Sequence, residues 1–229
     1  MILPENLFLG ENISSFRRGR FNRRFSFKSM LRGKGNTEGL NMPGVVRKIP
    51  SGRWDSPIVA RLRQFIDLGA AEIDALRGLI ECELNVERRR DLVIDGYEYS
   101  KLSFVKEGFA ARYKLLRNGR RQIINVMAPG DIIGLPGSFL DHAPFSVIAL
   151  TDLKLEVCSL DEFLAACHRQ PRFGIILSWL AIQEAMSYAD RVVDIGRRTP
   201  LERLAHFLLE IHGRLALVGR ATETDFDLP

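Results

Sequence analysis

The chain has 229 residues, of which 46% are hydrophobic and 27% charged, a composition typical of a soluble globular protein. No run approaches the roughly 18 consecutive apolar residues of a membrane span, and the first residues lack the basic leader of a secretory signal. The net charge of +5 is uneven, because residues 1–55 hold 11 Lys and Arg against 4 Asp and Glu, while residues 56–229 hold 22 against 24. The basic pI therefore does not indicate that the main body binds nucleic acid.

Residues 1–52 are predicted to form a basic, disordered leader. Their central part, residues 16–36, has no helical or strand period that would bury one face. Arginines alternate there with phenylalanines, a combination that can neutralise phosphates and stack on bases. Two alternatives stay open: the leader contacts nucleic acid without sequence preference, or it lies upstream of a true start at Met30 or Met42.

The three cysteines, Cys82, Cys158 and Cys167, are widely separated along the chain. Because none belongs to a CxxC pair, the sequence favours buried or half-buried thiols in a reducing cytoplasm over a disulfide framework or a zinc site. His206 and His212, on the last predicted helix, do not have a metal-ligand spacing either. We therefore expect no metal, no cofactor and a cytoplasmic location.

Two short helices are expected ahead of a strand-rich region. The first covers residues 57–65 and begins with Pro57, a residue that suits the first turn of a helix. The second covers residues 70–84, where apolar residues recur at helical spacing. After residue 84 the period of the apolar residues changes from helical to strand-like.

Residues 85–158 read as a series of short strands separated by turns. Asn118-Gly119 lies between two strand-like runs, residues 104–116 and 121–131, and predicts a hairpin whose two central residues both have positive φ. Pro129-Gly130-Asp131 predicts a further tight turn. Regular strands with short connections favour a barrel or a double-sheet jelly roll.

The longest helical pattern of the chain follows these strands. Ser159 and Glu162 form a capping box that opens a helix over residues 161–170, and a much longer helix follows at residues 171–196. Apolar residues on two sides of the long helix suit burial against both the strands and a partner subunit, whereas a core helix within one chain is the alternative. The residues predicted to line the dimer interface are Ile175, Trp179, Ile182, Met186, Ala189 and Val193.

A final helix is predicted after residue 199. Thr199 is a suitable N-cap, Pro200 occupies the first helical position, and Glu202 completes a capping box. Gly219 ends the helical pattern. The apolar stripe of this helix consists of Leu201, Leu204, Leu208, Ile211 and Leu215.

The expected elements follow the order helix pair, β-roll, long pairing helix and capped hinge helix, and this order resembles the Crp–Fnr family of bacterial transcription regulators. One segment of this chain resembles the family's consecutive strands, which end in a PGD turn: EGFAARYKLLRNGRRQIINVMAPGDIIG. The family's last strand and following helix resemble LTDLKLEVCSLDEFLAAC, and its hinge helix resembles RRTPLERLAHFLLEI. The final DFDLP resembles the strand that leads into the helix-turn-helix, so the resemblance extends from Pro57 to the last residue.

The resemblance implies an α+β fold, in which a cyclic-nucleotide-binding-like β-roll (a double-sheet jelly roll) is flanked by helices and followed by a long dimerisation helix and a hinge helix. The expected divisions are the leader at residues 1–52, a sensor domain at 53–170, the dimerisation helix at 171–196, and at 197–229 the start of a truncated winged helix-turn-helix domain. The implied partners are a second copy of the chain, DNA through a helix-turn-helix that is absent from this chain, and RNA polymerase. No membrane partner is expected.

The ligand site departs from the pattern of the family's cyclic-nucleotide binders, which use a Gly-Glu pair after the PGD turn and later an arginine that neutralises the cyclic phosphate. Here no glutamate follows Gly134, and no arginine occurs between Arg121 and Arg169. Because a desolvated phosphate without a cation is costly, we expect no response to cyclic AMP, and a pocket that holds a neutral small molecule or no ligand. The residues predicted to line the pocket are Gly134, Leu135, Gly137, Ser138, Phe139 and Ser146.

Three functions are compatible with these elements to different degrees. The first is a regulator whose β-roll senses, whose long helix dimerises, and whose absent helix-turn-helix reads an inverted repeat. The second is a truncated sensor without DNA-binding activity that pairs with full-length relatives. The third, a cupin-like enzyme, needs clustered histidine and carboxylate ligands, but only His142 lies in the strand region. We therefore expect a regulator without catalytic residues.

Overall fold

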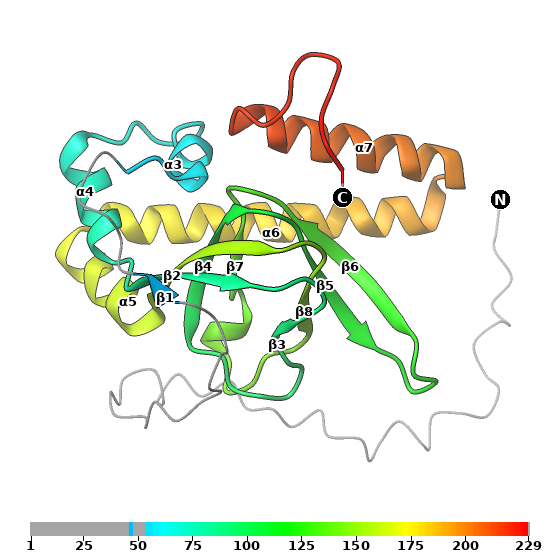
Figure 1. Ribbon diagram of the computed structural model, residues 1–229, viewed down its shortest axis with the longest axis horizontal. Helices are drawn as coiled ribbons and strands as arrows, with labels where there is room; N and C mark the ends of the chain where they lie inside the picture. Colours follow the sequence, from blue (N-terminus) through cyan, green and yellow to red (C-terminus); the bar gives the residue numbers. More distant parts are fainter. Residues whose placement is uncertain (1–45, 48–53, 229) are drawn as a thin grey trace, which may run out of the picture.

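The computed structural model describes residues 46–47 and 54–228, so most of the predicted leader lies outside the described residues. The described elements are shown in Figure 1. In chain order they are β1 (Val46–Arg47), α3 (Pro57–Leu62), α4 (Ala70–Gly78), β2 (Cys82–Val86), β3 (Asp91–Val93), β4 (Lys101–Glu107), β5 (Ala110–Leu115), β6 (Arg121–Met127), β7 (Ile132–Ile133), the 3₁₀-helix η1 (Gly137–Phe139), β8 (Ser146–Ala149), β9 (Leu153–Ser159), α5 (Leu160–Arg169), α6 (Pro171–Arg197) and α7 (Pro200–Leu217).

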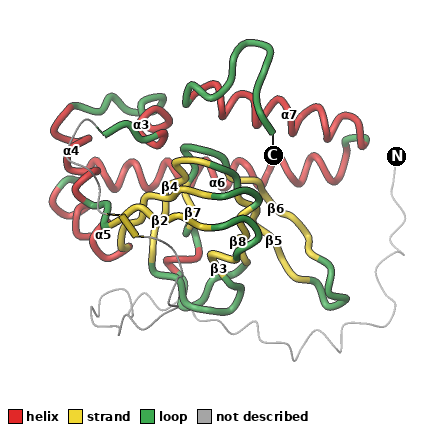
Figure 2. The backbone as a smooth tube through the Cα atoms, viewed as in Figure 1, coloured by secondary structure: helices red, strands yellow, loops and turns green. Residues whose placement is uncertain are grey.

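The strands form two antiparallel sheets, one with the order β1-β2-β9-β4-β7 and one with the order β3-β8-β5-β6. A hydrophobic cluster joins the two sheets and includes Val105 and Leu155 from the first and Met127 and Val147 from the second. Inward apolar residues from both sheets are the usual core of a β-sandwich. The predicted double-sheet β-roll with flanking helices is therefore confirmed (Figure 2).

The other face of the five-stranded sheet is covered by helices. Phe104 of β4 belongs to a second hydrophobic cluster with Ile58 of α3, Phe163 of α5 and Ile176 of α6. Burial of each such side chain contributes roughly 1.5–3 kcal/mol relative to exposure. This cluster fixes the first half of the long helix α6 on the β-roll.

Helix α7 lies alongside α6 and runs in the opposite chain direction (Figure 1). Its C-terminal half packs on the β-roll, where Ile211 and Leu215 are buried against Ala128, and Phe207 packs against the same cluster. In the first half of α7, Leu201 is 76% and Leu204 53% exposed. The predicted apolar stripe is therefore only partly covered by the described part of the chain.

Both predicted N-terminal helices are shorter than expected. Helix α3 ends at Leu62, and α4 ends at Gly78 instead of residue 84. The prediction for α4 is wrong because Glu81 already donates its N–H to the Val157 carbonyl (2.8 Å), which draws the following residues into β2. A long-range strand partner therefore overrides the local helical spacing.

The two predicted capping boxes have different outcomes. Ser159 makes no side-chain capping bond in α5; β9 continues to Ser159, and the Leu160 N–H donates to the Ser100 carbonyl (3.0 Å). The capping box of α7 is confirmed: the Thr199 N–H donates to the Glu202 carboxylate (2.7 Å), and the Glu202 N–H donates to Thr199 Oγ1 (3.4 Å). The hinge helix therefore begins where the sequence predicts.

The predicted strand over residues 104–116 consists of two strands that belong to different sheets. The chain changes sheet at Gly108, whose φ is +85° and where a Cβ would lie 2.1 Å from a backbone carbonyl oxygen, so glycine is required. The β5–β6 hairpin is confirmed, but Gly119 has positive φ and Asn118 does not. The Gly119 N–H donates to the Leu116 carbonyl (2.9 Å), which gives a longer turn than the expected two-residue turn.

Candidate sensor pocket and its link to the hinge

The segment predicted to bind a ligand follows the tight turn at Asp131 and contains β7 and η1. The two hydroxyl side chains among the predicted pocket residues form hydrogen bonds with main-chain groups. Ser138 Oγ donates to the Lys101 carbonyl (2.6 Å), and Ser146 Oγ accepts the Asp95 N–H (3.0 Å). These bonds hold the segment against β4 and the β3 side of the roll.

Glycine is required at Gly134 for the same close packing. Its φ is +123°, and a Cβ would lie 2.4 Å from the Lys101 carbonyl oxygen. Gly137 has only ordinary contacts at its Cβ position. Phe139 packs half-buried on the helical cluster that includes Phe104, so the predicted pocket residues do not all face one cavity.

Arg112 of β5 lies inside the β-roll and is fully buried. Its guanidinium forms an ion pair with Glu184 of α6 and donates to the Tyr188 hydroxyl (2.5 Å) and to the Leu135 carbonyl (2.9 Å). The same group lies 4.2 Å from the ring centroid of Phe145. One side chain therefore connects the sheet, the predicted ligand-binding segment and the long helix.

A buried guanidinium is costly unless a counter-charge and hydrogen-bond acceptors surround it. Burial lowers the pKa of Arg112, and its contact with Tyr188 partly offsets this effect. The carboxylate of Glu184 supplies the counter-charge. The positive charge of Arg112 is thus already matched by the chain itself.

Arg112 is not among the residues predicted to line the pocket. The family pattern places a phosphate-binding arginine in the segment after the PGD turn, whereas the structure brings Arg112 to this segment from β5. A signal existed in the strand alternation: Ala110 and Arg112 share the inner face of β5, while Ala111 and Tyr113 belong to a cluster on its outer face. An arginine at an inward strand position marks a buried polar cluster.

A cavity of about 240 Å³ lies beside this cluster, between α3, β6, α6 and α7. Asn125 of β6 lines the cavity and is paired with Arg112 across the hairpin. Within the described part of the chain, Asn125 Oδ1 and Arg112 Nε are buried without hydrogen-bond partners. Such atoms are sites for ordered water or a polar ligand group.

Asp131 of the PGD turn connects the β-roll to two helices. Its carboxylate accepts the Ala128 N–H (2.7 Å) and forms ion pairs with Arg61 of α3 and Arg214 of α7. Arg214 in turn forms an ion pair with Glu210 of α7 (3.2 Å). The turn next to the predicted ligand-binding segment is therefore tied directly to the hinge helix.

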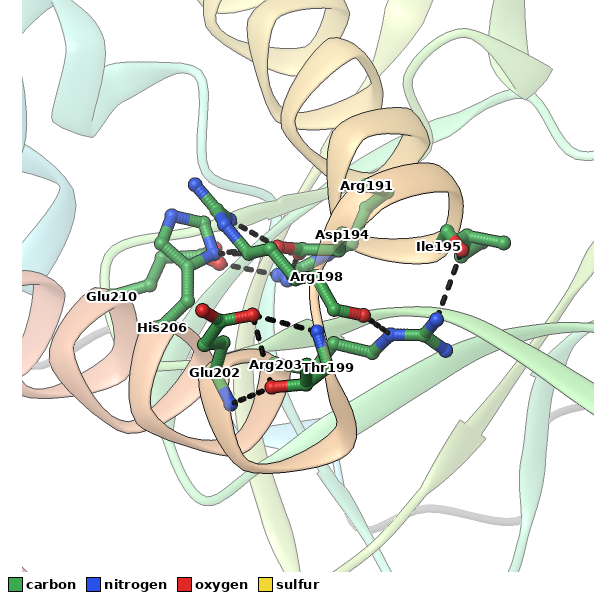
Figure 3. A network of polar contacts seen from close by, with 9 residues as sticks. All are labelled: Arg191, Asp194, Ile195, Arg198, Thr199, Glu202, Arg203, His206 and Glu210. Carbon is green, nitrogen blue, oxygen red and sulfur yellow. Dashed lines mark hydrogen bonds and ion pairs between the residues drawn. The ribbon is translucent and has the colours of Figure 1, made fainter.

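The ion-pair chain continues through Arg191 of α6, which pairs with both Glu210 and Asp194. Figure 3 shows Asp194 at the end of α6 in contact with Arg191 (3.1 Å), Arg198 and His206 (3.1 Å). Arg203 donates to main-chain carbonyls at the end of α6 (2.9 Å), a favourable position for a cation. The network fixes the angle between α6 and α7.

The Asp194→Asn substitution is expected to weaken this hinge in a pH-dependent way. Burial raises the pKa of Asp194, but Arg198, His206 and Arg191 outweigh it and hold the pKa below the ordinary 3.8. The stabilisation is therefore present above the ordinary pKa and is lost as pH falls through the lower folded value. At neutral pH we expect a loss of about 1–3 kcal/mol in the free energy of unfolding.

Urea unfolding at neutral pH and near pH 3 measures this effect of Asp194. The difference between the variant and the unmodified protein should shrink at the lower pH. Asp190→Asn is the matched control, because Asp190 lies on the same helix and makes no ion pair with any described residue. An equal loss for Asp194→Asn at both pH values would contradict the assigned role.

The residues predicted to line the dimer interface are mostly exposed on α6, and two of them, Trp179 and Met186, also line the cavity between α6 and the β-roll. Ile182 and Met186 are 57% and 56% exposed, and Ile175, Ala189 and Val193 are exposed as well. Trp179 differs, because it is half-buried and its ring is stacked on Phe65 with centroids 5.1 Å apart. The exposed residues form an apolar stripe, which we name the α6 seam.

The three thiols are free, and Cys158 is buried while Cys82 and Cys167 are half-buried, as the sequence predicts. Burial raises the pKa of Cys158 to about 12. In residues 54–228 no group of three or more His, Cys, Asp and Glu side chains is arranged to hold a metal ion. None of the helices described is both long enough and apolar enough to cross a bilayer.

Comparison with known proteins defines the class of the β-roll. Residues 83–170 match the model of the cyclic nucleotide-binding domain. The solved structure of FixK2 from Bradyrhizobium japonicum superimposes with a TM-score of 0.54 at 26% identity, over 58% of this chain and 66% of that chain. The Thermus thermophilus Catabolite Activator Protein shares the fold, with a TM-score of 0.50 at 21% identity over 72% of this chain and 80% of its own.

Sequence relatives place the chain more narrowly. It is 34% identical over 121 residues to the transcriptional activatory protein AadR of Rhodopseudomonas palustris, which corresponds to 52% of this chain and 48% of the relative. The expected resemblance to the Crp–Fnr family is confirmed: the chain carries a cyclic nucleotide-binding domain and is homologous to Crp–Fnr-type regulators. It spans about half the length of the first curated relatives that it matches.

Proposed function

We propose that this chain is the sensor and dimerisation part of a Crp–Fnr-type transcription regulator, and that its β-roll does not respond to cyclic AMP. The observation that carries the proposal is the position of Arg112, whose charge is matched by Glu184 inside the roll. A cyclic phosphate would have to compete with that carboxylate for the guanidinium. The guanidinium that a cyclic phosphate would need is therefore already engaged by a carboxylate of the same chain.

Homodimerisation through the α6 seam is the second part of the proposal. Ile182 and Met186 expose large apolar side chains on a helix of 27 residues. An exposed apolar stripe of this kind supports pairing with a second copy. Pairing would bring two sensor units and two hinge helices into a two-fold arrangement.

DNA and RNA polymerase are the proposed partners of the complete regulator, in the cytoplasm. A helix-turn-helix would read the DNA, supplied either by further sequence joined to this chain or by a full-length partner in a mixed dimer. The second possibility corresponds to a sensor that regulates by pairing. Two relatives are named as a transcriptional activatory protein and a nitrogen fixation regulation protein, and these names support a role in transcription.

Disruption of the gene in its host tests the proposed function. Transcript levels should change at a limited group of promoters, and the unmodified gene should restore them. A gene that carries Ile182→Glu and Met186→Glu should fail to restore them, because its product would not pair. Unchanged transcript levels after disruption, or full restoration by the double variant, would contradict the proposal.

Calorimetric titration with cyclic AMP is expected to show no saturable heat at tens of micromolar ligand. This range corresponds to about 6 to 7 kcal/mol of binding free energy. A cyclic-AMP-binding regulator titrated under the same conditions provides the positive control. A one-to-one isotherm for the unmodified chain would show that the ion pair of Arg112 with Glu184 gives way to the ligand.

A further inference from the structure

A groove lies on the outer face of the four-stranded sheet, opposite the face that carries Arg112. Its floor is apolar and includes Ile123, Ile148 and Leu150. Its rim carries three arginines, Arg88, Arg89 and Arg121. The groove has a volume of about 460 Å³, within the range of roughly 300–1,000 Å³ that is usual for small-molecule sites.

The backbone that carries two of these arginines is held in place from both sides. The Arg88 N–H donates to the Asp152 carboxylate (2.8 Å), and the Arg89 N–H donates to the Ala149 carbonyl (2.8 Å). Arg89 has φ of 68°, a conformation that residues other than glycine rarely adopt. The turn therefore places its guanidinium groups from a defined backbone rather than from a loose loop.

The charges at the rim are not neutralised by any of the residues that the structure describes. None of Arg88, Arg89 and Arg121 forms an ion pair with a carboxylate among the residues described. The guanidinium of Arg121 lies over the ring of Tyr113, 4.8 Å from its centroid. The contrast with Arg112 on the inner face is clear, because that arginine is paired with Glu184.

We propose that this groove binds a small anionic amphiphile, a molecule with a carboxylate or a comparable anion on a short apolar body. Guanidinium groups recognise such an anion through charge-assisted, paired hydrogen bonds. The apolar body would cover Ile123, which is 44% exposed, together with the rest of the floor. The apolar side chains of Ile123, Ile148 and Leu150 favour a ligand with an apolar body over a nucleic acid, whose backbone and base edges need polar contacts.

The test uses the full chain and sodium octanoate as the probe in a calorimetric titration. Octanoate should bind saturably with one molecule per chain. Acetate, which lacks the apolar body, and octyltrimethylammonium, which carries the opposite charge, should each give no saturable heat. Saturable octyltrimethylammonium binding, or no saturable octanoate binding, would overturn the proposal.

Substitutions locate the site. Arg89→Gln and Arg121→Gln should each weaken octanoate binding about tenfold, because each removes a charge-assisted contact, and Ile123→Asn should weaken it by removing part of the floor. Arg117→Gln is the matched control, since Arg117 is exposed in the same hairpin but does not line the groove. Thermal unfolding should show that all four variants stay folded, as expected for exposed positions. An equal effect of Arg117→Gln would overturn the proposal.

A last experiment distinguishes binding of a small anionic amphiphile from binding to a membrane surface. Vesicles of phosphatidylglycerol present many anionic headgroups without a free small amphiphile. Vesicles should not bind at physiological salt if the groove accepts single molecules. Vesicle binding that requires Arg89 and Arg121, without any binding of octanoate, would overturn the proposal in favour of a membrane contact.

Discussion

Replacement of Ile182 and Met186 with glutamate is expected to convert the protein from a dimer to a monomer. Both side chains are more than half exposed in the single chain, and both belong to the α6 seam. In a paired helix these positions would bury four charges at the seam, and an unpaired buried charge costs several kcal/mol. Analytical ultracentrifugation at micromolar concentration measures the result.

Gln122→Glu provides the control for this prediction. Gln122 is exposed in β6, in the four-stranded sheet and not on α6. It adds a surface charge without placing it in the seam, so the dimer should persist. A monomeric unmodified protein at micromolar concentration would contradict the assignment of the seam.

Substitution of Glu184 with glutamine is expected to have the largest effect on stability. Arg112 is fully buried, whereas the side chain of Glu184 is 16% exposed. Glu184→Gln would leave a buried cation without its counter-charge, a change that typically costs about 3–5 kcal/mol. Arg112→Met should cost less, because the remaining carboxylate keeps some contact with water.

A thermodynamic cycle is completed by the single variant Glu184→Leu and the double variant Arg112→Met with Glu184→Leu. Replacement of both partners by apolar residues removes the charge problem, so stability should recover most of the loss seen with Glu184→Gln. Urea unfolding of the unmodified protein, Arg112→Met, Glu184→Leu and the double variant gives the coupling energy between the two residues. Additive losses would contradict a direct ion pair inside the roll.

The order of elements and the hinge were predictable because they depend on local sequence. Thr199, Pro200 and Glu202 specify the start of α7 through short-range capping contacts, and the structure agrees. The β5–β6 hairpin follows from the Asn118-Gly119 sequence between two strand-like runs, although the turn conformation differs from the expected one. Local signals of this kind do not require knowledge of distant partners.

The errors arise where distant residues decide the local structure. The end of α4 depends on Glu81 and its bond to Val157, and the junction of β9 with α5 is held by the bond from the Leu160 N–H to Ser100. Neither partner is close in sequence. The boundary between strand and helix at these positions is therefore set by sheet pairing, which a single-sequence pattern does not contain.

The candidate site shows the same limit more sharply. The absence of a glutamate after Gly134 and of an arginine in the following segment was readable from the sequence. The ion pair between Arg112 and Glu184 was not, because the two residues belong to a strand and a helix that meet only in the folded protein. The inward position of Arg112 in β5 was the one available signal.

The most direct test is the rate at which the side-chain Nε–H of Arg112 exchanges with water, with and without cyclic AMP. In an arginine-selective ¹H–¹⁵N NMR spectrum, one Nε–H signal should exchange slowly with water and should disappear in Arg112→Lys, because this atom is buried. Excess cyclic AMP should leave that signal unmoved. A saturable shift on addition of cyclic AMP, or exchange as fast as that of surface arginines, would contradict an interior closed by the chain's own arginine.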